Sequence, residues 1–398
     1  MDTEGTLAAT VHSLRLQRLG MDLQDSEAGA LAEFWEEMAQ RGAPIIEDGS
    51  DSNSWVTFIW RDDGFARSVA VIQDWGADGI REYHMARLPD SDVWHLTRSM
   101  RPDTRTTYQL SPSASADHGQ TAPYRLDPLN PKIYTAYRSE NGSDIQFSVL
   151  ELPEAPALPW RQAGTAPGGT VTLHTPLGDQ RRLWVYRPSI DPGVPLPVLV
   201  VFDGERYKEL MQLPAMLDFL IDRGRIPPVA ALMVDSRDRC ELECRPDFAS
   251  YMAQRVMPWL RAAYPISADP ARTVLMGSSL GGLSAAYCAF THAHIWGRVV
   301  AQSGWFRWRP EGDPEHHWLA RQMAAGPQVP VQFWLQVGNL ETAKMADGGP
   351  SQLAANEFMR DALLGKGYPV SYQEFSGGHD TTSLEYPLAQ ALSEVYQG

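Results

Sequence analysis

The pattern of apolar and polar positions divides the chain into two parts with different predicted structures. From Trp55 to about residue 150, short β-branched and aromatic runs are separated by Gly, Asp and Pro, which is typical of a small β-sandwich. From Thr170 onward, near-continuous apolar runs alternate with helical stretches, which predicts an α/β domain with a mostly parallel sheet. The strands predicted in this second part are 170–176, 181–188, 197–203, 229–235, 273–277, 298–304, 331–338 and 370–378.

Two further segments complete the predicted organisation. The segment "EAGALAEFWEEMAQRG" has apolar residues at helical spacing and ends at Gly42, a suitable C-cap, so a helical region precedes the sandwich. The segment "LELPEAPALPWRQAGTAPGG" is rich in proline and glycine, which is typical of a linker. The predicted domains are therefore residues 1–150 (helix plus β-sandwich), a linker over 151–169, and an α/β domain over 170–398.

Composition narrows the class of protein. The chain has 398 residues, 43% of them hydrophobic and 21% charged, which is an ordinary globular composition with enough apolar residues for two cores. A net charge of −15 and the lack of a basic cluster argue against nucleic-acid binding. No apolar run approaches the roughly 20 residues that cross a bilayer, and the first residues have no signal-peptide core, so we expect a soluble, cytoplasmic protein. The three cysteines, Cys240, Cys244 and Cys288, are too few for a disulfide framework. Cys240 and Cys244 lie close in the sequence, but no histidine is nearby to complete a metal site.

The segment "VLMGSSLGGLSAAY" carries the clearest chemical signal. It contains the G-x-S-x-G motif at Gly277, Ser279 and Gly281, between a predicted buried strand and a helix of small residues. This order predicts a nucleophile elbow, a tight turn at which only very small neighbours let the strand and the helix approach. Ser279 is therefore the candidate nucleophile. The N–H of Leu280, at the start of the helix, is a candidate donor to a developing oxyanion.

A serine nucleophile needs a base, and His379 is the candidate. It lies in "FSGGHD", directly after the last predicted strand, where the chain order Ser, acid, His of α/β-hydrolases places the base. Five other histidines are less suitable because they lie in the first domain or at the end of the helix that follows the elbow: His84, His95, His118, His292 and His294. His316 and His317 precede the expected position of the acid.

The acid is expected after the strand that precedes the last one. Glu341 lies there, three residues beyond Gly338, in "FWLQVGNLETAK". Asp347 and Asp380 are alternatives, although Asp380 falls outside the expected chain order. An exposed loop glutamate without a catalytic role is the other interpretation of Glu341.

A second oxyanion donor is expected from the loop after an earlier central strand. The strand in "LVVFDGERY" ends near Asp203, so the backbone N–H of Gly204 or of Glu205 is the candidate.

With these residues in place, the chain resembles the enterochelin (enterobactin) esterase family, whose members hydrolyse catecholate siderophore esters and release iron. In the second part the resemblance rests on "VFDGERY", "CELECRPDFASYMAQRVMPWL", "MGSSLGGLSAAYCAF", "VVAQSGWFRW", "QVGNLE" and "GGHD", in the family's order. In the first part it rests on "WVTFIWRDD", "DVWHLT", "TTYQL" and "DPLNP". The resemblance implies an α/β-hydrolase preceded by a β-sandwich domain, with Ser279 as nucleophile, His379 as base and Glu341 at the position of the acid.

One segment of this chain departs from the family's pattern. The family carries R-x-x-E-L-x-x-N-x-x-F along the active site, and Glu241, Leu242 and Phe248 match it. The family's arginine is replaced by Asp238, and its asparagine by Arg245. These departures concern the substrate rather than the fold.

Ferric tris-catecholates are anionic, so their binding requires local positive charge. In "GWFRWRP", Trp305, Arg307 and Trp308 follow a predicted strand at the edge where open α/β sheets bind ligands. Aromatic faces and guanidinium groups suit catechol rings and negative oxygens. Arg239 and Arg245 are further candidates for substrate binding. Packing of the two tryptophans in the core or in a lid is the alternative interpretation.

The sequence thus predicts a serine esterase acting on a small-molecule siderophore ester such as the enterobactin trilactone. It predicts no organic or metal cofactor, with iron present only as part of the substrate, and neither a nucleic-acid nor a membrane partner; the oligomeric state stays open. One alternative is an esterase, peptidase or acyltransferase acting on another macrolactone, depsipeptide or assembly-line product. Another is a non-catalytic binding protein on a hydrolase scaffold.

Overall fold

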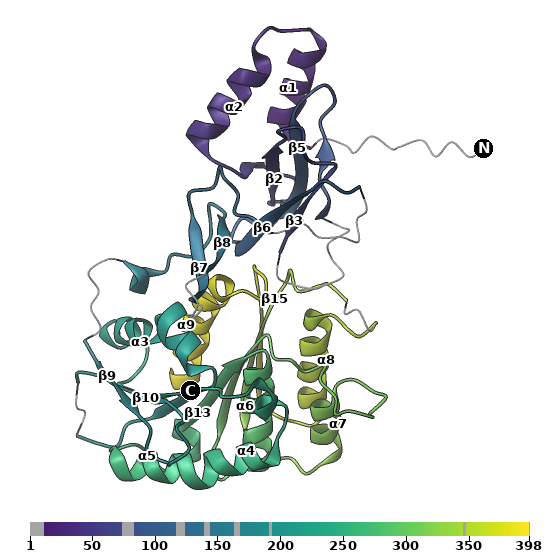
Figure 1. Ribbon diagram of the computed structural model, residues 1–398. Helices are drawn as coiled ribbons and strands as arrows, with labels where there is room; N and C mark the ends of the chain where they lie inside the picture. Colours follow the sequence, from purple (N-terminus) through teal and green to yellow (C-terminus); the bar gives the residue numbers. More distant parts are fainter. Residues whose placement is uncertain are drawn as a thin grey trace. The chain divides into compact units, whose positions relative to one another are not determined.

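The computed structural model describes residues 12–73, 83–116, 124–138, 144–162, 168–190, 193–344 and 348–397. The chain forms two compact units, Met1–Ala155 and Pro156–Gly398 (Figure 1). None of the helices in these described ranges combines the length and the apolar character that crossing a membrane requires.

The first unit consists of two helices and two antiparallel sheets. The sheets have the strand orders β1-β2-β5-β4 and β3-β6-β8-β7. They pack face to face, since the rings of Phe58 in one sheet and Tyr108 in the other lie 4.9 Å apart. The elements are α1 (Leu14–Gln24), α2 (Ala30–Arg41), β1 (Ile45–Asp48), β2 (Ser54–Arg61), β3 (Ser68–Ile72), β4 (Ala86–Arg87), β5 (Val93–Met100), β6 (Arg105–Ser113), β7 (Ile133–Arg138) and β8 (Asp144–Glu151).

The predicted helical region before the sandwich is two helices rather than one. Ser13 caps α1 by accepting a hydrogen bond from the N–H of Leu16, and Gly29 begins α2 with a φ of 99° that favours glycine. The apolar faces of both helices pack with residues of the sheet, among them Ile59 and Val93, into one buried cluster. Burial of this shared face is what makes two such short helices stable.

The second unit contains one sheet of eight strands in the order β16-β15-β14-β13-β11-β12-β10-β9. The strands from β16 to β12 are parallel, and β10 and β9 are antiparallel. The strands are β9 (Thr170–His174), β10 (Leu183–Arg187), β11 (Val198–Val201), β12 (Ala230–Val234), β13 (Thr273–Ser278), β14 (Arg298–Gln302), β15 (Gln332–Gly338) and β16 (Val370–Phe375). The helices are α3 (Leu213–Asp222), α4 (Pro246–Tyr251), α5 (Met257–Ala263), α6 (Leu280–Thr291), α7 (Trp318–Ala325), α8 (Gln352–Gly365) and α9 (Thr381–Gln397).

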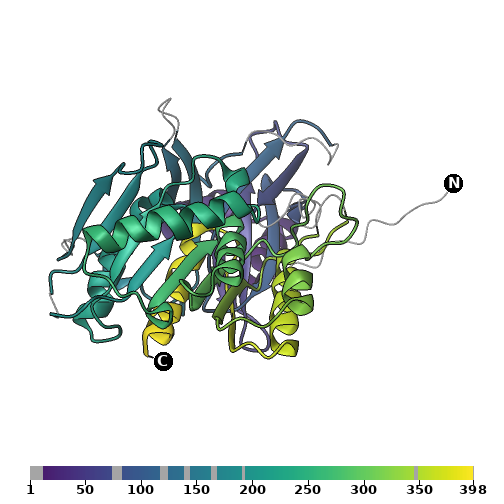
Figure 2. The ribbon, with the colours of Figure 1, turned by 90° about the horizontal axis from the view of Figure 1, so that it is seen from below.

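Helices cover both faces of this sheet (Figure 2). In β11, Val198 and Val200 point into the cluster that contains α4 to α8, whereas Leu199 and Val201 point into the cluster that contains α3 and α9. A strand buried on both faces has no polar side, which explains its continuous apolar run. The predicted α/β-hydrolase architecture and the preceding β-sandwich are both confirmed.

Part of the segment predicted as a linker, residues 151–169, packs into the second unit. Pro159–Arg161 form a short 3-10 turn within the second unit, and the Trp160 side chain is buried there. The buried carboxylate of Glu385 in α9 accepts hydrogen bonds from Trp160 Nε1 at 3.2 Å and from Arg161 Nε at 2.6 Å. The proline content of this segment indicates an irregular backbone. Its packing depends on Glu385, which lies more than 200 residues away in the sequence.

Glu385→Gln is expected to destabilise the second unit. The substitution removes the buried negative charge that faces the Arg161 guanidinium, so the free energy of unfolding should fall by about 2 kcal/mol, with a melting temperature lower by about 4–8 °C. Glu394→Gln, on the exposed side of the same helix, is the matched control and should change the melting temperature little. Equal melting temperatures of the two variants in differential scanning calorimetry would show that the Glu385 pairing has no stabilising role.

Candidate active site

Ser279 occupies a strained turn between a strand and a helix. It is the one residue between β13 and α6, and its backbone has φ 54° and ψ −121°. A Cβ built on Gly277 would lie 2.4 Å from the carbonyl carbon of Gly281, so no larger residue fits at Gly277 while the helix stays in place. The strand, turn and helix therefore follow the order predicted for a nucleophile elbow.

Three neighbouring strands end in non-glycine residues with left-handed backbone conformation. Asp203, Ser279 and Ser303 have φ values of 54°, 54° and 44°, and they follow β11, β13 and β14, which are adjacent in the sheet. Such conformations are uncommon outside glycine, and they cluster at functional sites. Together they mark the carboxyl edge of the parallel strands as the site.

Glu341 lies in the loop after β15 and is almost completely buried, with 1% of its surface exposed. Its Oε1 accepts hydrogen bonds from the N–H of Gly338 at 2.8 Å and from Ser303 Oγ at 2.5 Å. Its Oε2 lies 2.7 Å from His379 Nδ1. A buried carboxylate requires such partners, and here they hold it in one orientation, facing the histidine.

His379 lies in the loop after β16, with its side chain 22% exposed. Because a carboxylate only accepts hydrogen bonds, Nδ1 must carry the proton, which leaves Nε2 of a neutral ring free to accept one. The loops that carry Glu341 and His379 are bonded to each other, since Leu340 N–H donates to Gly377 O at 3.1 Å. The structure thus brings the predicted base and the predicted acid together.

Asp380, one of the two alternative acids, has a different role in the structure. Asp380 Oδ1 accepts hydrogen bonds from the N–H groups of Thr382 and Ser383 at 3.0 and 3.1 Å, so it caps the start of α9. Asp347 lies outside the described residues.

The loop after β11 lies beside the elbow. A methyl group on Gly281 would stand 3.5 Å from Asp203 Oδ2, which places the start of α6 next to that loop. The predicted oxyanion donors, Leu280 and either Gly204 or Glu205, thus belong to two neighbouring chain segments. The first N–H groups of a helical turn have no partner within the turn, so both segments present donors at this edge.

Ser303 is a functional candidate that the sequence analysis missed. Besides its contact with Glu341, its N–H donates to Gln336 O at 2.6 Å, and its carbonyl accepts from Gln352 Nε2. The segment "AQSG" contributed to the family resemblance, but nothing in the spacing of Ser303 indicated that its hydroxyl reaches the acid.

The structure places Trp305 next to Ser279 and gives Arg307 and Trp308 packing contacts. The N–H of Trp305 donates to Ser279 O at 2.9 Å. The Arg307 guanidinium lies over the Trp305 ring at 3.9 Å, and the residue is only 8% exposed. Trp308 packs edge-to-face on Trp318, with ring centroids 5.6 Å apart. Both predicted tryptophans are therefore partly buried against the core, and their role in substrate binding stays a prediction.

The other two predicted arginines carry carboxylate partners. Arg239 Nη1 lies 3.3 Å from Asp203 Oδ1, at the loop beside the elbow. Arg245 pairs with Asp247 at 3.4 Å at the start of α4 and bonds to none of the candidate catalytic residues that the structure describes. Asp238, at the family's arginine position, accepts a hydrogen bond from the N–H of Cys240 and caps a short turn.

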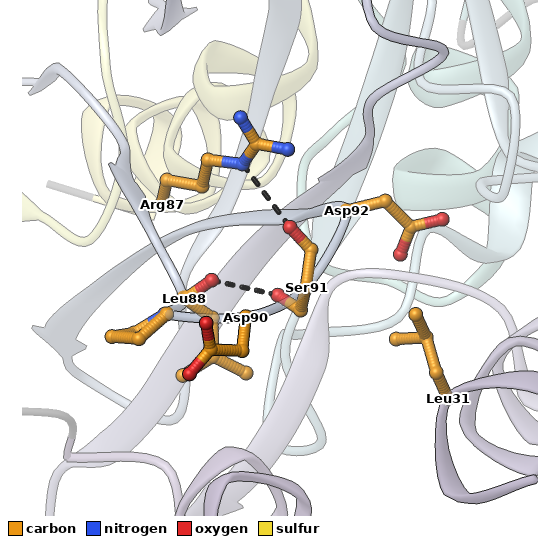
Figure 3. Close-up of a pocket in the computed structure, with 7 residues that line it drawn as sticks. Leu31, Arg87, Leu88, Asp90, Ser91 and Asp92 are labelled. Atoms are coloured by element: carbon orange, nitrogen blue, oxygen red, sulfur yellow. Dashed lines mark hydrogen bonds between the residues drawn. The ribbon is translucent and has the colours of Figure 1, made fainter. Parts of the chain in front are cut away.

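Two clefts of about 590 Å³ lie elsewhere and contain none of the candidate catalytic residues. One lies in the first unit, where Leu31 faces the turn between β4 and β5 (Figure 3). Arg87 Nε donates to Ser91 O at 3.1 Å, and Ser91 Oγ donates to Leu88 O at 2.8 Å. These polar groups of the cleft therefore stabilise the turn itself. The other lies at the opposite, amino edge of β14 and β15. Among the residues that the structure describes, no group of three or more His, Cys, Asp or Glu side chains is arranged to hold a metal ion.

Comparison with known proteins shows the family to which the chain belongs. The esterase family model matches residues 175–395, and the model of the enterochelin esterase N-terminal domain matches residues 55–161. The iron(III) enterobactin esterase of Dickeya dadantii (strain 3937) is 30% identical over 413 residues, covering 90% of this chain and 91% of that protein. The chain belongs to the enterochelin esterase family.

Further members of this family show the same extent of similarity. The iron(III) salmochelin esterase of Escherichia coli O6:H1 is 28% identical, covering 93% of this chain and 94% of that protein. The crystal structure of ferric enterobactin esterase from Salmonella typhimurium superposes with a TM-score of 0.75 at 25% identity, covering 92% of this chain and 98% of that one. This enterochelin esterase family member is therefore a carboxylic ester hydrolase with the predicted fold.

Ser303→Ala is expected to lower kcat for ester hydrolysis about tenfold and to leave KM unchanged, because the hydroxyl acts by orienting Glu341 toward His379. The readout is the steady-state rate with a p-nitrophenyl ester. Ser303→Gly is the matched variant, since it also removes the hydroxyl but relieves the left-handed backbone. If the glycine variant keeps the full rate, the hydroxyl does not position the acid.

Proposed function

We propose that this protein is a serine esterase that cleaves the ester bonds of a catecholate siderophore of the enterobactin type, with release of the iron. The observation that carries the proposal is the contact between the buried Glu341 carboxylate and His379 Nδ1, at the strand edge where Ser279 forms the elbow. The names of the relatives, iron(III) enterobactin and salmochelin esterases, support the substrate class.

In the proposed mechanism, Ser279 Oγ attacks the ester carbonyl while His379 Nε2 takes its proton. The Glu341 carboxylate stabilises the imidazolium that forms. The N–H of Leu280, together with that of Gly204 or Glu205, binds the oxyanion of the tetrahedral intermediate. The C–O bond to the leaving alkoxide then breaks, and His379 donates the proton to that oxygen. Water, activated by His379, attacks the acyl-enzyme and releases the carboxylic acid and Ser279.

This mechanism uses no cofactor, and iron belongs to the substrate. The proposed binding surface begins at Trp305, whose backbone contacts Ser279, with the Arg307 guanidinium against the indole ring. Arg239 extends it on the other side of the elbow, where it meets Asp203. Arg245 and Trp308 complete the proposed surface. We place the activity in the cytoplasm, where a cell uses the released iron.

A specific observation also favours a second substrate class. Asp238 caps a turn at the position where the family has an arginine, and Arg245 at the asparagine position pairs with Asp247. The same catalytic residues with a different binding surface would suit another macrolactone or depsipeptide. The reaction remains acyl transfer to water.

Hydrolysis of ferric and iron-free enterobactin tests the proposal directly. Ser279→Ala should lower kcat/KM by about a millionfold, because removal of the nucleophile leaves only binding and the oxyanion hole. Glu341→Gln should lower it by about ten-thousandfold, since the amide no longer selects the productive histidine tautomer. The products are followed by liquid chromatography, with a p-nitrophenyl ester assayed in parallel.

Glu374→Gln is the matched control, because Glu374 is an exposed carboxylate on β16, the strand that precedes His379. An equal loss of activity in Glu374→Gln and Glu341→Gln would contradict the assignment of the acid. Cleavage of the simple ester without cleavage of the trilactone would overturn the siderophore substrate and favour the second class.

A further inference from the structure

An anionic substrate requires positive charge at the site, and several of the arginines near it already face a carboxylate. Each of these arginines forms an ion pair with a carboxylate of the same unit, which offsets part of its charge. They are Arg181 with Glu241, Arg182 with Glu205 and Asp235, Arg239 with Asp203, and Arg245 with Asp247. The negative charge of the whole chain adds to this effect.

Arg206 differs from these arginines. Its Nε and Nη2 donate to Thr381 Oγ1 at 3.1 and 2.9 Å, and no carboxylate in the described part of the chain forms an ion pair with it. A hydroxyl group is neutral, so this contact does not offset the positive charge of the guanidinium. The side chain of Arg206 is half-buried. Its partner, Thr381, comes two residues after His379 in the sequence.

The backbone also places Arg206 at the candidate site. It directly follows Gly204 and Glu205, the two candidate oxyanion donors, and it begins a π-helical turn, Arg206–Leu210. Tyr207, the next residue, anchors this turn, because its hydroxyl bonds to Gln302 Oε1 at 3.2 Å. π-helical turns are rare and occur frequently at functional sites. Arg206 is thus held between the segment that presents the oxyanion donors and the segment that carries the base.

The surroundings of this guanidinium favour an anion. Thr381 is the first residue of α9, whose amino end carries partial positive charge. The Asp380 carboxylate is directed to Thr382 and Ser383, where it caps that end of the helix. The contacts with Thr381 use Nε and Nη2 of Arg206, which leaves Nη1 to donate to a negatively charged oxygen of a ligand.

We infer that Arg206 is a specificity-determining residue that binds an anionic oxygen of the substrate, in place of the cation that Asp238 removes from the family's position. This inference rests on the proposed esterase activity and assigns a charge to the substrate group beside the scissile ester. Arg206 selects substrates by charge, so it lowers KM for anionic esters and contributes little to the hydrolysis of neutral ones.

The test compares Arg206→Ala, Arg206→Lys and a control, Arg360→Ala. Arg360 pairs with Asp361 in α8, so its loss gives the same change in net charge away from the elbow. The substrates are ferric enterobactin and two p-nitrophenyl esters, one with a neutral and one with a carboxylate-bearing acyl chain. Arg206→Ala should raise KM for both anionic substrates about tenfold or more and change kcat/KM for the neutral ester less than about twofold. Arg206→Lys should fall between this variant and wild type, and Arg360→Ala should match wild type.

Two outcomes would overturn the inference. An equal loss for the anionic and the neutral esters would mean that Arg206 supports the fold of the His379 loop through Thr381, and melting temperatures of the alanine and lysine variants measure that effect. An unchanged KM for both anionic substrates would mean that Arg206 binds no anion. If wild type cuts the nitrophenyl esters but not ferric enterobactin, the proposed substrate fails, while the two nitrophenyl esters still decide the role of Arg206.

The affinity for an anionic ligand that is not hydrolysed tests the role of Arg206 without any turnover. The ferric complex of 2,3-dihydroxybenzoate, which has no ester, is titrated into Ser279→Ala protein with and without Arg206→Ala, and tryptophan fluorescence is followed. The additional substitution should weaken binding about tenfold. Equal affinities would contradict the inference.

Discussion

The arrangement of the candidate site depends on one buried carboxylate. Glu341 has almost no contact with solvent, so both of its oxygens need hydrogen-bond donors, and these come from Gly338, Ser303 and His379. The donors lie at or after the ends of three different strands, β15, β14 and β16. The geometry therefore exists only while these strands keep their register, in which Gln302 pairs with Gln336 and Gly338 pairs with Phe375.

The sheet provides that register because it is buried on both faces. Apolar residues on alternate sides of each central strand pack against helices, and a slip of one residue would exchange the two faces. This rigidity also maintains the strained backbone at Asp203, Ser279 and Ser303, three positions at adjacent strand ends. The stability of the core thus maintains local conformations that are unfavourable by themselves but that present the serine and the backbone donors at one edge.

The candidate catalytic residues and the arginines around them have different kinds of partners. The candidate catalytic residues contact one another at one edge of the sheet, whereas several of the arginines around them are paired with carboxylates. The proposed reaction and the proposed choice of substrate thus rest on separate sets of residues. Such a separation lets a hydrolase change its ester substrate through surface arginines while the elbow and the acid–histidine contact stay intact.

The sequence by itself determined the two-domain order, the α/β-hydrolase class and the candidates Ser279, Glu341 and His379. This was possible because the constraints are local: an elbow needs small residues around the serine, buried parallel strands need continuous apolar runs, and the base and the acid follow particular strands.

The tertiary structure alone decided which residues meet. Ser303 bonds to Glu341, and Arg161, in the segment predicted as a linker, bonds to Glu385. Arg206 bonds to the hydroxyl of Thr381, whereas other arginines pair with carboxylates. The partners of Ser303, Arg161 and Arg206 in these contacts are between 38 and 224 residues away. A side chain's charge can be read from its sequence position, but whether that charge is available to a ligand depends on which distant loop lies beside it.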